Sequence, residues 1–163
     1  MNAIPCLTIE DVASLDGVLA KFLKRAEAEL TVVIDRGGNV ISQYGDMSVM
    51  DVTIIAALAA GSFAATAELA RRIGEVEFNA LYHQGNGNHI FMNSVDEETI
   101  MITIFGQRTT VGVVRFYSKG VGQAVAALMK GLSQGGHGFS FDASDVTATA
   151  IFADPPSSAA SAL

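Results

Sequence analysis

The sequence is poor in cysteine, in basic residues and in long uninterrupted apolar runs. Cys6 is the single cysteine of the 163 residues, so no disulfide can form within the chain. The chain has 10 Lys and Arg against 17 Asp and Glu, a formal charge of -7, which argues against a general attraction to nucleic-acid phosphates or anionic lipid. The charge-free run 52–67 is shorter than the roughly eighteen apolar residues of a membrane span. We therefore expect no nucleic-acid partner and no membrane span.

The first residues lack the basic segment and the apolar stretch of a secretion signal, which favours a cytoplasmic location. Hydrophobic residues make up 50% of the chain and charged residues 17%, so the chain can bury a substantial core. The length is typical of a single domain.

Apolar periodicity and turn signals predict the order α-β-β-α-β-β-β-α along the chain. Helical spacing of apolar residues covers 8–29, and Thr8 can cap the first turn. "LTVVID" and "NVISQY" are then predicted to be two strands joined by the turn "RGG", with Asp35 and Asn39 on either side of it. A long helix follows Asp51, its expected N-cap.

The second half of the chain contains three further strand candidates, "NHIFMNSV", "TIMITIF" and "VGVVRFY", which we expect to form an antiparallel meander. The long helix before them is predicted to end at Gly74, and a last helix to begin at Ser118. The pattern describes an α/β (α+β) sandwich whose five strands are covered by helices. We expect one domain over 8–133 and a C-terminal extension over 134–163, which should be mobile from about residue 154 because it is rich in Pro, Ser and Ala.

Several groups of residues that could carry chemistry favour structural roles instead. His83, His89 and His137 lie at long and irregular separations, unlike zinc ligands, so we expect no metal and no cofactor. The glycine-rich "HQGNGNH" does not open a helix, as phosphate-binding loops do. No pair of nucleophile and base stands out, so we expect no catalytic residues. Arg108 and Arg115 could in principle neutralise a transferring phosphate, but we interpret both as structural.

The helix after Asp51 is unusual because most of its uncharged positions are Ala, Gly, Ser or Thr. At helical spacing its residues form three stripes. The first is Ala57, Gly61, Ala64 and Glu68; the second, which can face the sheet, is Leu58, Ala65, Leu69 and Ile73; the third is Ala56, Ala60, Phe63 and Ala67. Two explanations remain open. The small residues either pack closely on a flat sheet or leave a shallow apolar platform for a partner.

Three stretches of the chain resemble the roadblock/dynein light chain domain family, and within it the MglB type of bacterial regulators of a Ras-like GTPase. They are "LAAGSFAATAELARRIGEVEF" in the long helix, "HQG" at 83–85 and "FGQRTTVGVVRF" at 105–116. The resemblance implies a homodimer. It also implies a five-stranded antiparallel sheet with the long helix on one face and the other two helices on the opposite face.

The resemblance further implies two binding surfaces on the protein. The GTPase would dock on the long helix, at Ala57, Gly61, Ala64, Glu68 and Arg72. The second copy would contact that helix and the strand "NHIFMNSV", which we expect at the sheet edge. The residues of this dimer interface would be Ala56, Ala60, Phe63, Ala67, Ile90, Met92 and Ser94.

We therefore expect a cytoplasmic homodimeric regulator of a small Ras-like (MglA-type) GTPase. It would stimulate GTP hydrolysis by docking, without an active site of its own, and would act by shifting the GTPase between conformations. The alternative is a non-catalytic roadblock-type scaffold or adaptor for a protein complex. A small-ligand sensor is a third and weaker possibility, because it would need a polar residue in the core and the candidate strands show none.

Overall fold

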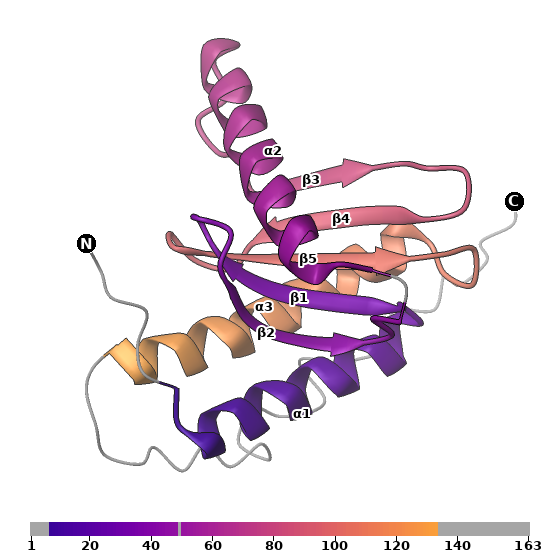
Figure 1. The fold of residues 1–163 in the computed structure, drawn as a ribbon. Helices are drawn as coiled ribbons and strands as arrows, with labels where there is room; N and C mark the ends of the chain where they lie inside the picture. Colours follow the sequence, from indigo (N-terminus) through magenta and orange to yellow (C-terminus); the bar gives the residue numbers. More distant parts are fainter. Residues whose placement is uncertain (1–6, 49, 134–163) are drawn as a thin grey trace, which may run out of the picture.

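The computed structural model describes residues 7–48 and 50–133, which form one five-stranded antiparallel sheet and three helices (Figure 1). In chain order the elements are α1 Ile9–Ala26, β1 Leu30–Asp35, β2 Val40–Gly45, α2 Val52–Arg72, β3 Ala80–His83, β4 His89–Ser94, β5 Thr99–Phe105 and α3 Val111–Ser133. The strands lie side by side in the order β2-β1-β5-β4-β3. The predicted order α-β-β-α-β-β-β-α is confirmed. The expected C-terminal extension, 134–163, lies outside the described residues.

Strand side chains alternate between the two faces of the sheet, and this alternation creates two apolar layers. Val32 and Ile102 belong to the layer beneath α2, together with Phe63 of that helix. Val33 and Met101 belong to the layer beneath α1 and α3. One long helix therefore covers one face of the sheet and two helices cover the other, as Figure 1 shows. This arrangement confirms the predicted sandwich.

Local sequence signals fix where the first helices begin. Thr8 and Asp11 form a capping box, in which the Asp11 backbone N–H donates to Thr8 Oγ1 at 3.2 Å and the Thr8 N–H donates to Asp11 Oδ2 at 2.8 Å. Asp51 Oδ1 accepts from the backbone N–H groups of Thr53 and Ile54. Both predicted N-caps are confirmed. The first helix is shorter than expected, because Glu27 adopts the left-handed conformation, with φ of 53°, and ends it after Ala26.

The turn between β1 and β2 touches the start of α2. Asp35 brackets it as expected, accepting from the Asn39 backbone N–H at 2.8 Å and from its side-chain amide at 2.7 Å. Gly38 has φ of 88°, and a Cβ there would lie 2.9 Å from the Cα of Ala57. Only glycine therefore allows the turn to approach the helix this closely.

The prediction of a strand over "VGVVRFY" is wrong, because these residues form the first turns of α3. The Thr110 carbonyl accepts from the Val114 N–H at 3.0 Å, which starts the helical ladder. Val114, Tyr117 and Val121 are all buried, and their spacing of three and four residues turns one helical face toward the sheet. The helix therefore begins at Val111 instead of Ser118.

The fifth strand is β3, a four-residue segment that the sequence pattern leaves unassigned. It pairs with β4 from Ala80 opposite Asn93 to His83 opposite Ile90. The segment "NHIFMNSV" supplies β4, which lies between β5 and β3, so its predicted place at the sheet edge is wrong. The outer edge on this side belongs to β3.

The α2 helix is long and apolar enough, by length and composition alone, to cross a membrane. Such a helix is weak evidence of a span, because helices in the cores of water-soluble proteins meet the same criteria. In this fold α2 lies on the sheet and buries the side chains of Val52, Ala56, Ala59, Ala60, Phe63 and Ala70.

Candidate protein interface

The five residues expected to bind a GTPase are all exposed along α2. Ala57, Gly61, Ala64, Glu68 and Arg72 follow one another at intervals of three or four residues, so they lie along one side of the helix. A Cβ built at Gly61 meets no other atom within 4 Å, which shows how open this side is. The described structure thus brings the predicted site residues together on one accessible strip.

Large apolar side chains accompany this strip on the outer face of α2. Leu58 is 68% exposed, Leu69 61% and Ile73 74%, and Val76 just beyond the helix is 96% exposed. The expectation that the stripe of Leu58, Leu69 and Ile73 faces the sheet is therefore wrong. Exposed apolar side chains that gather on one helix face are typical of a surface that binds another protein.

The sheet-facing side of α2 consists mainly of alanines and one aromatic side chain, with Val52 and Ile55 near the start of the helix. Ala56 and Ala60 are buried, and so is Phe63, whose ring lies 4.9 Å from that of Phe78 by their centroids. The guanidinium of Arg36 lies 5.3 Å from the centre of the Phe63 ring. The helix therefore rests close to the sheet on its alanines and is anchored at the middle by Phe63.

This packing corrects part of the expected dimer interface. Ala56, Ala60, Phe63 and Met92 are buried within the single chain, so their side chains have no surface to offer a second copy. The remaining residues of that set, Ala67, Ile90 and Ser94, are half-buried. Of these, the Ser94 hydroxyl accepts from Arg36 Nη2 at 2.6 Å.

Charged residues close the outer face at the C-terminal end of α2. The Glu68 carboxylate accepts from Arg71 Nε and Nη2, each at 2.9 Å, and from Arg72 Nε at 2.7 Å. These bonds, first those of Arg71 and then that of Arg72, hold the pKa of Glu68 below its ordinary value of 4.5. Neither guanidinium therefore extends alone from the helix.

The two arginines considered for a catalytic role lie elsewhere. Arg108 is exposed in the segment between β5 and α3. Arg115 belongs to α3, on the opposite face of the sheet from α2, and its guanidinium lies 5.8 Å from the centre of the Phe91 ring. Among residues 7–48 and 50–133, no group of three or more His, Cys, Asp or Glu could hold a metal ion.

The edge strand β3 is a feature of this surface that the sequence pattern misses. Its four residues are too few for a period-two pattern to stand out, and their exposure does not alternate, because Leu81 and Tyr82 are both half-buried between exposed Ala80 and His83. Phe78, two residues before the strand, packs on Phe63 of α2. This contact ties the segment before β3 to the inner face of α2.

The profile of the Roadblock/LC7 domain matches residues 15–105, more than half of the chain. The chain belongs to the roadblock/LC7 family. The family resemblance seen in the sequence is thereby confirmed. None of the curated protein sequences matches the chain.

Solved structures of roadblock proteins share the fold. MglB from Myxococcus xanthus is 30% identical, with 77% of this chain and 95% of that chain covered and a TM-score of 0.71. The gliding protein MglB from Thermus thermophilus is 24% identical, with coverage of 80% and 99% and a TM-score of 0.72. An MglB with a tetrameric arrangement is 23% identical, with coverage of 81% and 99% and a TM-score of 0.74.

Proposed function

We propose that this roadblock protein is a homodimeric regulator of a small Ras-like GTPase of the MglA type. It stimulates GTP hydrolysis by docking and supplies no catalytic group. The observation that carries the proposal is the exposed small and apolar outer face of α2, in a chain 30% identical to M. xanthus MglB over 77% of its length. Residues 8–133 form the regulatory domain, and its GTPase partner places the protein in the cytoplasm.

The chemistry of the outer face suits a rigid protein partner. Ala57, Gly61 and Ala64 carry almost no side chain, so another backbone or a flat surface can approach the helix closely. Leu58 and Leu69 lie beside them, and their exposed apolar surface is removed from water only when a partner covers it. The helix carries no charged residue between 53 and 67. The centres of protein interfaces are depleted in charged residues in the same way.

Dimerisation through β3 brings two such faces together. The outer edge of β3 has no strand beside it among the described residues, and such an edge carries unpaired N–H and C=O groups. A second copy related by a two-fold axis can pair there and extend the sheet. Leu69, Ile73 and Val76 lie on and just after the part of α2 that leads toward β3, so they become covered in the same contact.

Docking then acts on the conformation of the GTPase. In the described part of the chain both arginines at the end of α2 are bound to Glu68, so neither projects as a free cation toward a phosphate. A partner that binds only one GTPase conformation raises the population of that conformation by its difference in affinity. Hydrolysis is accelerated when the preferred conformation is the one whose own groups are aligned for the reaction.

The substitution Ala64→Arg tests the proposal. A long charged side chain at the centre of the docking strip should cost about 2 kcal/mol of binding or more, so stimulation at limiting regulator should fall at least about tenfold. Because Ala64 is exposed, the free energy of unfolding should change by less than about 1 kcal/mol and the dimer should persist.

Ala13→Arg is the matched control, because Ala13 is also an exposed alanine but lies on α1, across the sheet. Single-turnover GTP hydrolysis by the purified GTPase is measured with wild type and both variants. Unchanged stimulation by Ala64→Arg would show that the GTPase docks elsewhere. A wild-type protein that binds the GTPase without altering its hydrolysis rate would instead identify a scaffold or adaptor.

A further inference from the structure

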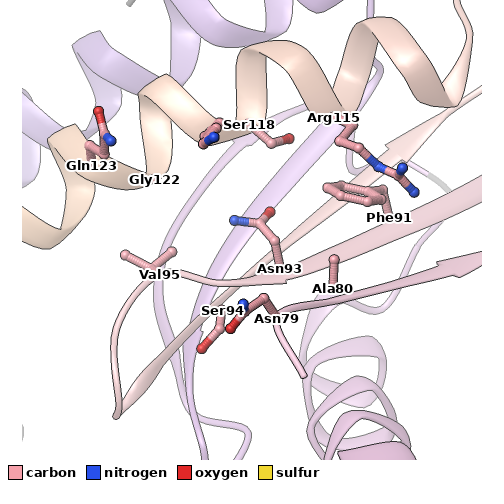
Figure 2. Close-up of a pocket in the computed structure, with 11 residues that line it drawn as sticks. Asn79, Ala80, Phe91, Asn93, Ser94, Val95, Arg115, Ser118, Gly122 and Gln123 are labelled. Carbon is pink, nitrogen blue, oxygen red and sulfur yellow. The ribbon is translucent and has the colours of Figure 1, made fainter. Parts of the chain in front are cut away.

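A cavity of about 300 Å³ lies between α3 and the paired strands β3 and β4, on the face of the sheet opposite α2 (Figure 2). Its walls are partly apolar, with the Phe91 ring and Val95 contributed by β4 and the residue after it. Asn93 points from β4 toward the helix, and Ser118 faces it from α3. The cavity is therefore built from three separate elements and combines an apolar part with a polar part.

Two polar atoms that line the cavity have no hydrogen-bond partner in the described part of the chain. They are the Ser118 hydroxyl oxygen and Asn93 Oδ1, and both atoms are buried. Ser118 as a whole is only 1% exposed. Buried polar groups are almost always hydrogen-bonded, so an orphaned pair facing one cavity indicates a missing partner. The expectation that the candidate strands show no polar residue in the core is wrong, because Thr31 of β1 and Thr103 of β5 are fully buried.

Two cations stand at the same cavity without a carboxylate. Arg115 and Lys119 both line it, and they lie one turn apart on the same side of α3. Their positive charges repel each other at this spacing. Among the described residues that form the walls none is acidic, although the whole chain has a formal charge of -7. The site is thus a positive spot on an acidic protein, and an anion would relieve the repulsion.

We propose that this cavity binds a small organic carboxylate. The carboxylate is held by the Arg115 guanidinium, whose planar fork matches its two oxygens, and by the Ser118 hydroxyl as a further donor. Asn93 Oδ1 is an acceptor and cannot bind a carboxylate, so the Asn93 amide turns over on binding and presents Nδ2 as the third donor. The apolar body of the ligand lies against Val95 and Ala80, which line the cavity beside the buried Phe91. The cavity volume is at the low end for ligand pockets and exceeds what an inorganic phosphate needs, which favours a carboxylate with a short apolar body.

This site is separate from the proposed GTPase-docking face. The cavity and the outer face of α2 lie on opposite sides of the sheet, so a ligand and a GTPase can be bound at the same time. Ala80 and Asn79 line the cavity at and next to the edge strand β3. A bound ligand therefore contacts the strand that is proposed to pair with the second copy.

Gly122 provides a way to close the cavity. A Cβ at this position would lie 3.5 Å from Asn93 Nδ2, an ordinary contact, so a side chain can start there and extend into the cavity. Gly131, on the same helix, has no atom within 4 Å of such a Cβ and does not line the cavity. Gly122→Met and Gly131→Met are therefore a matched pair in which only the first fills the site.

The test is a titration of the full-length protein with benzoate, a carboxylate on an apolar ring. Two-dimensional 1H–15N NMR follows the side-chain amide of Asn93 and the backbone amide of Ser118. We expect saturable shifts of both signals with benzoate. Benzamide, the neutral counterpart, and inorganic phosphate should each bind at least about tenfold more weakly, because one lacks the charge and the other the apolar body.

Four variants complete the experiment. Arg115→Met should weaken benzoate binding about tenfold or more, whereas Lys130→Met, which removes an exposed cation from the same helix outside the cavity, should not. Gly122→Met should abolish binding and Gly131→Met should preserve it. If Gly122→Met does not fold, the Arg115→Met result decides whether the cavity binds benzoate. Arg115 is exposed, so its replacement should leave the protein folded. The proposal is overturned by absent saturation, by equal binding of benzamide or phosphate, or by unchanged affinity in Arg115→Met.

Discussion

Replacing Ala80 by proline tests whether β3 pairs with a second copy of the chain. The Ser94 N–H donates to the Asn79 carbonyl at 2.8 Å, and the β3–β4 register continues with Ala80 opposite Asn93. Hydrogen-bonded and non-hydrogen-bonded pairs alternate in an antiparallel ladder, so the N–H of Ala80 points away from β4 toward the outer edge. Ala80→Pro therefore removes a donor that the single chain does not use.

The size of the effect follows from the symmetry of the dimer. Each copy loses one donor, so a two-fold pairing loses two hydrogen bonds. At about 0.5–1.5 kcal/mol for each bond, the dimer is weakened by about 1–3 kcal/mol, which raises its Kd by a factor of about 5–150. The proline ring also crowds the seam. The fold of the protomer should change little, because β3 keeps its hydrogen bonds to β4.

Sedimentation velocity over a dilution series measures the dimer Kd of wild type and variant. Gln43→Pro is the matched control on the opposite edge strand, β2, where Gln43 pairs with Val32. The Asp46 N–H donates to the Glu29 carbonyl, and the same alternation then turns the N–H of Gln43 outward. Equal Kd values for Ala80→Pro and wild type would refute pairing through β3, as would a wild-type protein that is monomeric at tens of micromolar.

Two further predictions concern α2. Phe63→Ala should lower the free energy of unfolding by about 3 kcal/mol or more, whereas Leu58→Ala, on the exposed face of the same helix, should change it by less than about 1 kcal/mol in chemical denaturation. The Glu68 pKa is lowered, so the bonds of Glu68 to its two arginines are intact above pH 4.5 and are lost as the pH falls through the lowered value. In a 13C NMR titration Arg71→Met should raise this pKa more than Arg72→Met does, and the reverse order would contradict the assigned cause.

The orientation of α2 shows where sequence periodicity stops being informative. Three stripes of the helix are apolar, so periodicity alone favours the stripe with the larger side chains, Leu58, Leu69 and Ile73, as the buried one. The structure buries the alanine stripe with Phe63 instead. Small residues suit a flat sheet because they let the helix axis lie closer to it. The sequence of the helix does not show whether an apolar stripe will pack on the sheet or on a partner protein.

The strands and helices illustrate a different limit. Capping residues such as Thr8 and Asp51 act within one turn, so their roles could be predicted from the sequence. "VGVVRFY" is rich in β-branched residues and favours a strand locally, but packing of Val114 and Tyr117 on the sheet overrides that preference. β3 is held in the sheet by β4, and four residues carry too little local signal to reveal it.

The candidate surfaces divide in the same way. The outer strip of α2 could be predicted because Ala57, Gly61 and Ala64 form a continuous helical stripe that matches a family pattern. The cavity beneath α3 could not be predicted, because Asn93 and Ser118 are 25 positions apart and meet only when the helix is laid across the strand. A single polar residue inside an apolar stretch does not indicate which other polar residue it will meet in the folded protein.

The thin alanine layer beneath α2 separates what keeps the protein folded from what it recognises. Ala56 and Ala60 have no room to vary, because any larger side chain would lift the helix from the sheet. Leu58 and Ala57, next to them in sequence, project outward and can change without disturbing the interior. A duplicated copy of such a gene could therefore acquire a new partner through successive substitutions on the outer face, each at little cost to its stability.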